Sequence, residues 1–201
     1  SSADTYAGTL GGTGATQNLL ALTKSGAGLL TLSGNNTYTG GTTFNGGTLN
    51  VASANALGTS GNLAFTGGAL QYSAANTTDY SSQIVNSSSA IAIDTNSQNL
   101  TYASALAASN SGGLTKLGAG ALTLSATNAY TGATMVNAGT LALANGSLGD
   151  TAITVASGAT FTASGNDTIG SSGTSSLTIN SGGTLSLADG TINTLTINSA
   201  T

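Results

Sequence analysis

Residues 22–32 read Leu-Thr-Lys-Ser-Gly-Ala-Gly-Leu-Leu-Thr-Leu. Residues 114–124 read Leu-Thr-Lys-Leu-Gly-Ala-Gly-Ala-Leu-Thr-Leu, so nearly the same phrase returns further along the chain. The likeness continues downstream, and the two related repeats span residues 22–58 and 114–149. A repeat at a fixed offset is typical of arrays in which each unit buries its apolar face on its neighbour. We therefore interpret residues 1–201 as a single segment of stacked coils.

Apolar and polar residues alternate within each copy. Leu30 and Leu32 flank Thr31, and Leu122 and Leu124 flank Thr123. A period of two places alternate side chains on one face of a strand. The sequence therefore predicts half-buried strands, whose inward residues are Leu30, Leu32, Leu49, Val51, Leu122, Leu124, Leu141 and Leu143.

Glycine turns recur at a nearly regular interval along the chain. The turn glycines fall at positions 28, 47 and 68, and later at positions 120, 139, 158 and 183. Such an interval suits one coil of a solenoid that contains two or three short strands. We therefore predict an all-β fold, a parallel β-helix (β-solenoid) of roughly nine coils.

The segment from Gln71 to Gly112 is the least regular part of the chain. Residues 84–85, 90–93 and 100–102 still have the composition of short strands, with polar turns between them. Residues 105–108 could form a single helical turn.

The composition excludes several classes of protein. The chain has 30 Gly, no Pro, no Cys, no His and only 4% charged residues, with a net charge of −4. A nucleic-acid partner is excluded because its binding needs clustered Lys or Arg. The absence of Cys is compatible with export. No basic segment of a signal peptide begins at Ser1, so we expect a mature fragment.

The repeats resemble the passenger-associated transport repeat of autotransporters, bacterial proteins whose passenger is exported through an outer-membrane barrel. The second copy departs from the pattern at Ala126, Thr127 and Ala138. The resemblance implies a right-handed parallel β-helix, secretion or display on the bacterial cell surface, a translocation barrel in the parent chain, and no catalytic residue. It rests on Lys24, Gly26, Ala27, Gly28, Leu30, Leu32, Gly34, Asn36, Tyr38, Gly40, Gly47, Thr48, Leu49 and Val51.

Three aspartates are the candidates for a metal site. Asp150, Asp167 and Asp189 recur at intervals close to the coil period, so they could stack and hold a cation. Calcium requires several oxygen ligands that converge on one ion, and solvated turn aspartates are the simpler interpretation. We assign no catalytic, cofactor-binding or metal-binding residue.

Two residue types occupy fixed positions in both repeats. Lys24 and Lys116 are the two cationic side chains of the sequence. They could form a transport or docking signal, and the simpler interpretation is that each lies at a strand edge and discourages edge pairing. Tyr38 and Tyr130 are expected to pack within turns, because aromatic rings supply a large contact area.

Four functions are compatible with this fold. A structural stalk of a passenger is favoured, and an adhesin with an unknown surface ligand is the alternative. A carbohydrate-active enzyme is disfavoured because such sites usually gather carboxylates, Arg or His. Ice or mineral binding would need an unbroken threonine row, against which the irregular coil lengths argue. The candidate row is Thr31, Thr123, Thr154, Thr178 and Thr196.

The ends of the segment predict self-association. Residues 1–10 and 195–201 have the composition of ordinary coil strands, without a charged or helical cap. An open solenoid end exposes unpaired backbone groups and an apolar layer. We expect these ends to be covered by further coils of the parent chain or by end-to-end stacking of a second copy, which can continue into fibres.

Overall fold

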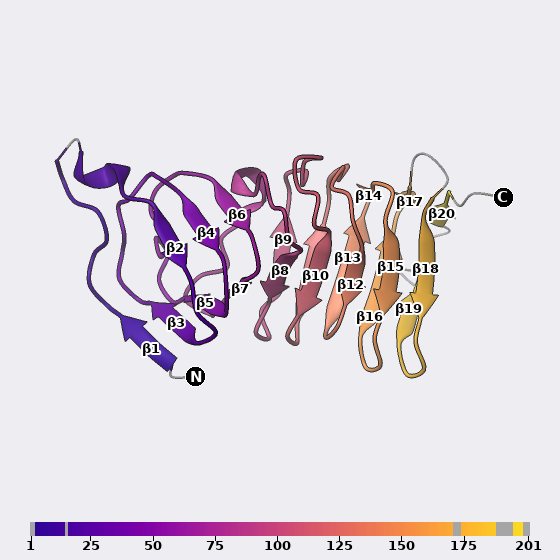
Figure 1. Ribbon diagram of the computed structural model, residues 1–201. Coiled ribbons are helices and arrows are strands. Elements are labelled where there is room, and N and C mark those ends of the chain that lie inside the picture. Colours follow the sequence, from indigo (N-terminus) through magenta and orange to yellow (C-terminus); the bar gives the residue numbers. More distant parts are fainter. Residues whose placement is uncertain (1–2, 15, 171–173, 188–194, 199–201) are drawn as a thin grey trace.

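The chain winds into an elongated stack of parallel strands (Figure 1). This computed structural model describes residues 3–14, 16–170, 174–187 and 195–198. The largest sheet has nine strands, and each successive pair of strands in it is one full turn apart, so the nine strands enclose eight turns. The predicted all-β parallel solenoid of roughly nine coils is thereby confirmed. The nine strands are β1 (Ala3–Tyr6), β3 (Leu29–Leu32), β5 (Thr48–Val51), β7 (Ala69–Gln71), β8 (Ile91–Asp94), β10 (Leu114–Leu117), β12 (Thr134–Val136), β15 (Ala152–Val155) and β18 (Ser176–Ile179).

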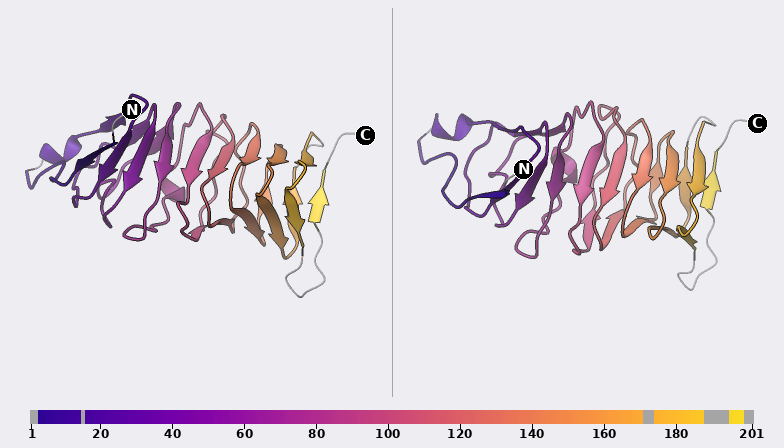
Figure 2. Two further views of the ribbon diagram at one scale, coloured as in Figure 1. Left: turned by 90° about the horizontal axis from the view of Figure 1, so that it is seen from below. Right: turned by 60° about the horizontal axis from the view of Figure 1, so that its bottom comes forward.

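Three smaller sheets form the other sides of the coils. The two views in Figure 2 show their strands side by side along the same axis. The N-terminal three-stranded sheet contains β2 (Leu22–Lys24), β4 (Thr42–Phe44) and β6 (Leu63–Phe65). The five-stranded sheet contains β9 (Leu100–Tyr102), β11 (Ala121–Leu124), β13 (Thr140–Ala144), β16 (Thr160–Ser164) and β19 (Thr184–Ser186). The C-terminal three-stranded sheet contains β14 (Ser147–Leu148), β17 (Asp167–Ile169) and β20 (Leu195–Ile197).

The two repeats occupy different sides of the solenoid. In the first copy, β2 and β4 belong to the N-terminal three-stranded sheet, and β3 and β5 to the nine-stranded sheet. In the second copy, the equivalent β10 and β12 belong to the nine-stranded sheet, and β11 and β13 to the five-stranded sheet. The repeat therefore encodes a local turn-and-strand unit and does not prescribe one side of the coil.

The turn between neighbouring strands depends on glycine at a single position. Gly47 and Gly139 have φ of 60° and 62°, a conformation that side chains rarely adopt. A Cβ atom at either position would also collide with the carbonyl oxygen of Gly28 or Gly120 in the preceding coil. A Cβ atom at Gly46 would meet its nearest neighbour at 3.4 Å, an ordinary contact, so the departure to alanine in the second copy is tolerated.

Apolar side chains form continuous inward rows. Leu49 pairs in register with Leu70, and Leu70 pairs with Ile93, and all three are fully buried. Each such side chain contributes roughly 1.5–3 kcal/mol when it is withdrawn from water. The predicted inward set is confirmed, and within it Leu30 is half-buried and packs against the edge of the core.

The irregular middle segment is organised by side chains as well as by strands. The predicted strands at 90–93 and 100–102 are confirmed as β8 and β9, and Ile84 forms an isolated bridge with Leu63. The predicted helical turn at 105–108 is wrong. Asn110 accepts a hydrogen bond from Ser87 N and donates one to Ile84 O, which ties this stretch to the preceding coil. Single 3-10 turns occur at Gln17–Leu19 and Ser81–Gln83.

Candidate functional site

Lys24 is buried within the solenoid. Its side chain is 6% exposed, and its Nζ atom donates to three carbonyl oxygens. The acceptors are Ser25 O at 3.1 Å and Gly26 O at 2.9 Å in its own turn, and Gly46 O at 3.0 Å in the next coil. The ammonium therefore joins the turns of two successive coils.

Lys116 repeats this arrangement in the second copy. Its side chain is fully buried, and Nζ donates to Leu117 O at 2.8 Å, Gly118 O at 2.7 Å and Ala138 O at 3.0 Å. The acceptors lie one, two and 22 residues after the lysine, the same offsets as for Lys24. We call each three-carbonyl arrangement a lysine clasp.

The clasps contradict the interpretation that each lysine lies at a strand edge and discourages pairing with another strand there. Strand β10 lies inside the nine-stranded sheet, and Lys116 occupies an inward row between Ile93 and Val136. Strand β2 does lie at a sheet edge, but the Lys24 side chain is turned inward. A buried ammonium is also inaccessible to a docking partner. The signal was present in the sequence, because the period of two places Lys116 on the same face as Leu114.

Burial also alters the acidity of Lys116. Withdrawal from water disfavours the charged ammonium and lowers the pKa of Lys116 from 10.5 to about 8, and the nearby Asp94 carboxylate partly opposes this shift. The ammonium remains charged at neutral pH. Its three hydrogen bonds to carbonyl oxygens take the place of the lost hydration.

A repeated asparagine joins three coils in each copy. Asn36 accepts a hydrogen bond from Leu10 N at 2.7 Å and donates to Ala56 O at 2.6 Å. Asn128 accepts from Leu106 N at 2.9 Å and donates to Ser147 O at 3.2 Å. Each side chain therefore satisfies backbone groups of the coil before it and the coil after it, which buried polar groups require.

The repeated tyrosines are confirmed as packing residues. Tyr38 and Tyr130 are fully buried, and each hydroxyl shares a 2.7 Å hydrogen bond with the threonine four residues later, Thr42 or Thr134. Burial raises the pKa of Tyr38 to about 12, and it also raises the pKa of Tyr130. Neither phenol ionises at neutral pH.

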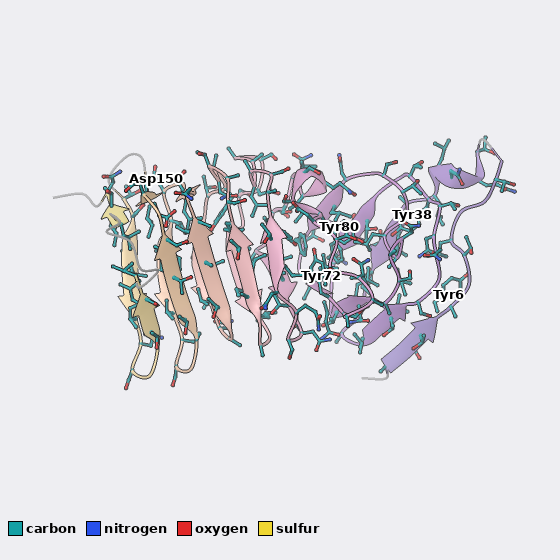
Figure 3. The ribbon with its side chains drawn as sticks, turned by 180° about the vertical axis from the view of Figure 1, so that it is seen from behind. Tyr6, Tyr38, Tyr72, Tyr80 and Asp150 are labelled. Carbon is teal, nitrogen blue, oxygen red and sulfur yellow. The ribbon has the colours of Figure 1, made fainter. Side chains whose placement is uncertain are left out.

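A second tyrosine cluster lies in the irregular segment and was missed by sequence reasoning. The hydroxyls of Tyr72 and Tyr102 are 3.0 Å apart, and Asn76 donates to the Tyr80 hydroxyl at 2.8 Å. Figure 3 shows Tyr72 and Tyr80 inside the coils, away from the end at which Tyr6 lies. The sequence signal that could have predicted this cluster is the presence of three tyrosines in a segment whose strand periodicity is weak.

The structure does not place the candidate aspartates in one common environment. Asp167 is 1% exposed and accepts a hydrogen bond from Gly146 N at 2.9 Å, so its interpretation as a solvated turn residue is wrong. Asp150 is half-buried and lies towards the C-terminal end (Figure 3). Asp189 lies outside the described residues. In the described part of the chain, no three His, Cys, Asp or Glu side chains converge as metal ligands would.

The candidate threonine row is also wrong as a single row. Thr31 and Thr154 lie in the nine-stranded sheet, Thr123 in the five-stranded sheet, and Thr196 in the C-terminal three-stranded sheet. Thr154 pairs directly with Thr178 on the neighbouring strand.

An open groove lies beside two strands of the C-terminal three-stranded sheet. It has a volume of about 560 Å³ and lies over β14 and β17. Its lining combines the apolar side chains of Ala129 and Leu148 with hydroxyl, amide and carboxylate groups, and the polar residues include Thr127, Asn145, Ser147, Asp150, Asn166 and Thr168. The groove offers hydrogen-bonding groups, and the sequence supplies it with no His or Arg for acid–base chemistry.

Comparison with known proteins bears out the resemblance found in the sequence. Residues 22–51 and 114–143 each match the family model of the passenger-associated transport repeat. The chain is 36% identical over 138 residues to the adhesin BmaC autotransporter of Brucella suis biovar 1 (strain 1330). That match covers 62% of this chain and 4% of the adhesin. No solved structure matches significantly. Among the described residues, no helix has the length and hydrophobicity of a membrane span.

Proposed function

We propose that this chain, an autotransporter passenger segment that carries two passenger-associated transport repeats, serves as a rigid structural stalk. The repeats and the autotransporter relative indicate a segment that is secreted or displayed on the bacterial cell surface. The chain spans only 4% of that relative's length, so the activity of a whole passenger is not transferred to it. The proposed partner during export is the outer-membrane translocation barrel of the parent chain.

The lysine clasps are the observation that carries the proposal. In both repeats a buried ammonium ties its own turn to a carbonyl oxygen 22 residues later, which lies in the next coil. Solenoid stability is approximately a sum of terms between neighbouring coils. We infer that each repeat fastens a new coil onto the preceding one as the passenger leaves the membrane, which would explain the association of the repeat with transport.

An adhesin remains the second candidate, because the relative's name describes an adhesin. The groove over β14 and β17 is the concave surface that such a ligand contact would use. We propose no enzymatic activity for either role, since the groove is lined by hydroxyl and amide groups and a single carboxylate, that of Asp150, without the paired carboxylates that acid–base chemistry on sugars uses.

Self-association is part of the stalk proposal. Tyr6, Leu19 and Leu20 are exposed at the N-terminal end of the described solenoid. Leu185, Leu187 and Ile197 are exposed at the opposite end. We propose that further coils of the parent chain cover these ends, and that the isolated segment stacks end to end through them.

An export experiment tests the stalk proposal. Lys24→Ala and Lys116→Ala are introduced together into the parent chain, and protease-resistant passenger at the cell surface is measured against total synthesis. Thr23→Ala with Thr115→Ala is the matched control, because these neighbours lie beside the lysines on the same strands. We expect the lysine variant to lose protease-resistant passenger and the control to keep it. Equal amounts from both variants would refute the proposed role of the repeats.

A further inference from the structure

The second repeat shows how one coil covers the next. Strand β8 pairs with β10 in register, and Ile93 lies beside Lys116. The turn that follows β8 continues this contact, because Thr95 N donates to Leu117 O at 3.1 Å. The strand, the lysine and the turn of this repeat are therefore covered by an aliphatic strand that leads into a polar turn.

The same surface of the first repeat is open in the described chain. Strand β2, the counterpart of β10, is the terminal strand of its sheet. Leu22 is half-buried, whereas its counterpart Leu114 is fully buried. A Cβ atom at Gly118 would collide with the Asp94 carboxylate of the covering coil, but one at Gly26 would have no described atom within 4 Å. A cavity of about 460 Å³ lies against β2, the turn that follows it and the start of β3.

Strand β20 ends the side of the solenoid that β2 begins. Contacts between successive coils connect the N-terminal three-stranded sheet to the C-terminal one, so the two sheets lie on one side, at opposite ends of the stack (Figure 1). The connecting contacts are the Leu63–Ile84 bridge, Ser111 N to Ser87 O, Thr131 N to Asn110 O, and the Thr127–Ser147 bridge. An end-to-end contact of two copies therefore brings β20 of one copy to β2 of the next.

The sequence of β20 repeats the pattern of the strand that covers β10. Residues 91–95 read Ile-Ala-Ile-Asp-Thr, and residues 195–199 read Leu-Thr-Ile-Asn-Ser. In each, two aliphatic residues flank a smaller one, and an Asp or Asn and then a hydroxyl residue follow. Leu195 is half-buried and Ile197 is 37% exposed, so β20 presents apolar surface that a further strand would cover.

The backbone of β20 has the orientation that this pairing requires. Alternate residues of a strand direct their N–H and C=O groups to opposite sides. Ile91, the first residue of β8, donates its N–H to Gly113 O beside β10. Asn198 N donates to Ile169 O of β17, so Leu195, three residues earlier, directs its N–H to the other edge of β20. Leu195 is thus oriented as Ile91 is.

The outer edge of β2 supplies the matching groups. Leu22 N donates to Gly41 O, and Lys24 O accepts from Asn45 N, so both residues face β4. The backbone groups of Thr23, between them, face the other edge. No described strand pairs with that edge, which can therefore extend its sheet by one strand.

We propose that β20 of one copy adds to the edge of β2 in a second copy, with Leu195 beside Leu22 and Ile197 beside Lys24. This rests on the proposed self-association of the stalk and identifies the residues of its joint. The incoming strand occupies the position that β8 has over β10. The two joined edges are different surfaces, so the contact is heterologous and each copy can join two others.

Cross-linking of single-cysteine variants of the whole chain tests this joint. Thr23 and Thr196 are exposed and would lie side by side, within the reach of a disulfide. Thr23→Cys and Thr196→Cys, one of them tagged, are mixed at high concentration under mild oxidation, and the mixed dimer is measured. In the control, Thr101→Cys on β9 replaces Thr23→Cys. We expect at least about tenfold more mixed dimer than in the control, because docking raises the effective concentration of the two thiols.

A second substitution tests the apolar contact of the joint. Ile197→Lys, added to Thr196→Cys, places a charge opposite the Lys24 ammonium and should abolish the excess of mixed dimer. Met135→Lys is the matched control, because Met135 is 43% exposed on β12 in the body of the stack. Both substitutions change an exposed side chain, and circular dichroism checks that both variants are folded.

Three outcomes would overturn the joint. The mixed dimer could be no more abundant than in the Thr101→Cys control, or Met135→Lys could abolish it as fully as Ile197→Lys does. A predominance of Thr23→Cys homodimer would instead indicate contact between two N-terminal ends. The export experiment on the lysines is independent of these results, so a failed cross-link with an intact export effect would refute the joint and leave the stalk.

Discussion

Lys116 Nζ lies 3.0 Å from the carbonyl oxygen of Ala138, which is one coil further along the chain. The same ammonium also donates to the two carbonyl oxygens that follow it in sequence. Hydrogen bonds to a charged group contribute roughly 1.5–3 kcal/mol each, so three of them offset part of the cost of burying the ammonium, and the lowered pKa of Lys116 shows that the cost is not fully offset. Lys24 makes the equivalent contacts in the other repeat.

Lys116→Met should therefore destabilise the chain. Methionine fills a similar volume but removes the donor from Gly118 O and Ala138 O, while Leu117 O still accepts from Thr95 N, and we expect a loss of about 1–3 kcal/mol in the free energy of unfolding. Urea denaturation at pH 7 measures this loss. Thr115→Ala on the outward side of β10 is the control and should change stability by less than about 0.5 kcal/mol. A methionine variant as stable as the control would show that the clasp contributes nothing.

The stability of the chain should pass through an alkaline maximum. The pKa of Lys116 is about 8 in the folded chain, and an unperturbed lysine, as in the unfolded chain, has a pKa of 10.5. Between pH 8 and 10.5 the unfolded state therefore binds more protons than the folded state, and stability rises with pH. Burial raises the pKa of Tyr38 to about 12 from 10.0, so above pH 10 the unfolded state releases protons first and stability falls. Urea midpoints at pH 7, 9 and 11 would reveal both limbs.

Lys116→Met separates the two limbs of this pH profile. The variant should lose the rise above pH 8 and keep the fall above pH 10, because the tyrosines are unchanged. A rise that persists in the variant would assign it to a different group.

The hydroxyl of Tyr130 should stabilise the second repeat modestly. It shares a buried hydrogen bond with Thr134, whose hydroxyl is 2.9 Å from that of Thr151. Tyr130→Phe leaves Thr134 with one partner fewer, and we expect a loss of about 1 kcal/mol. Tyr6→Phe is the control, because Tyr6 is 41% exposed. Thermal unfolding of both variants distinguishes them, and equal midpoints would place the Tyr130 hydroxyl outside the stabilising network.

Leucine truncation tests the inward rows. Leu124 is fully buried, so Leu124→Ala should cost about 2–5 kcal/mol. Leu19 is 69% exposed, and Leu19→Ala should cost less than about 0.5 kcal/mol. Chemical denaturation gives both values, and a midpoint unmoved by Leu124→Ala would be incompatible with this core.

The sequence predicts the strands of this molecule better than its polar interior. Alternation of apolar and polar residues at 122–124 is visible without a structure, because the periods of strands and helices differ. The lysine clasp could not be predicted in the same way, since its third acceptor lies 22 residues from the ammonium. Asp167 was misjudged for a similar reason, because its donor is Gly146 N in the preceding coil.

Which residues lie side by side on neighbouring strands depends on the lengths of the turns, and the pattern of apolar and polar residues does not reveal those lengths. Thr123 and Thr154 have similar local sequences and lie in different sheets. Only the register of the coils determines which threonines meet, and that register emerges from the packing of the whole stack.

Disulfide formation between chosen neighbours tests the central claim, that residues one coil apart lie side by side in a parallel solenoid. Thr154 and Thr178 pair directly on β15 and β18, and parallel neighbours ~4.8 Å apart fall within the range that a disulfide spans. The chain has no native cysteine, so the double variant Thr154→Cys/Thr178→Cys contains a single possible intramolecular pair. Mild oxidation should close it rapidly, as measured by loss of free thiol in monomeric protein, whereas Thr123→Cys/Thr178→Cys, with its residues in different sheets, should stay reduced. Oxidation of the second pair at the same rate, or no oxidation of the first, would contradict the solenoid described above.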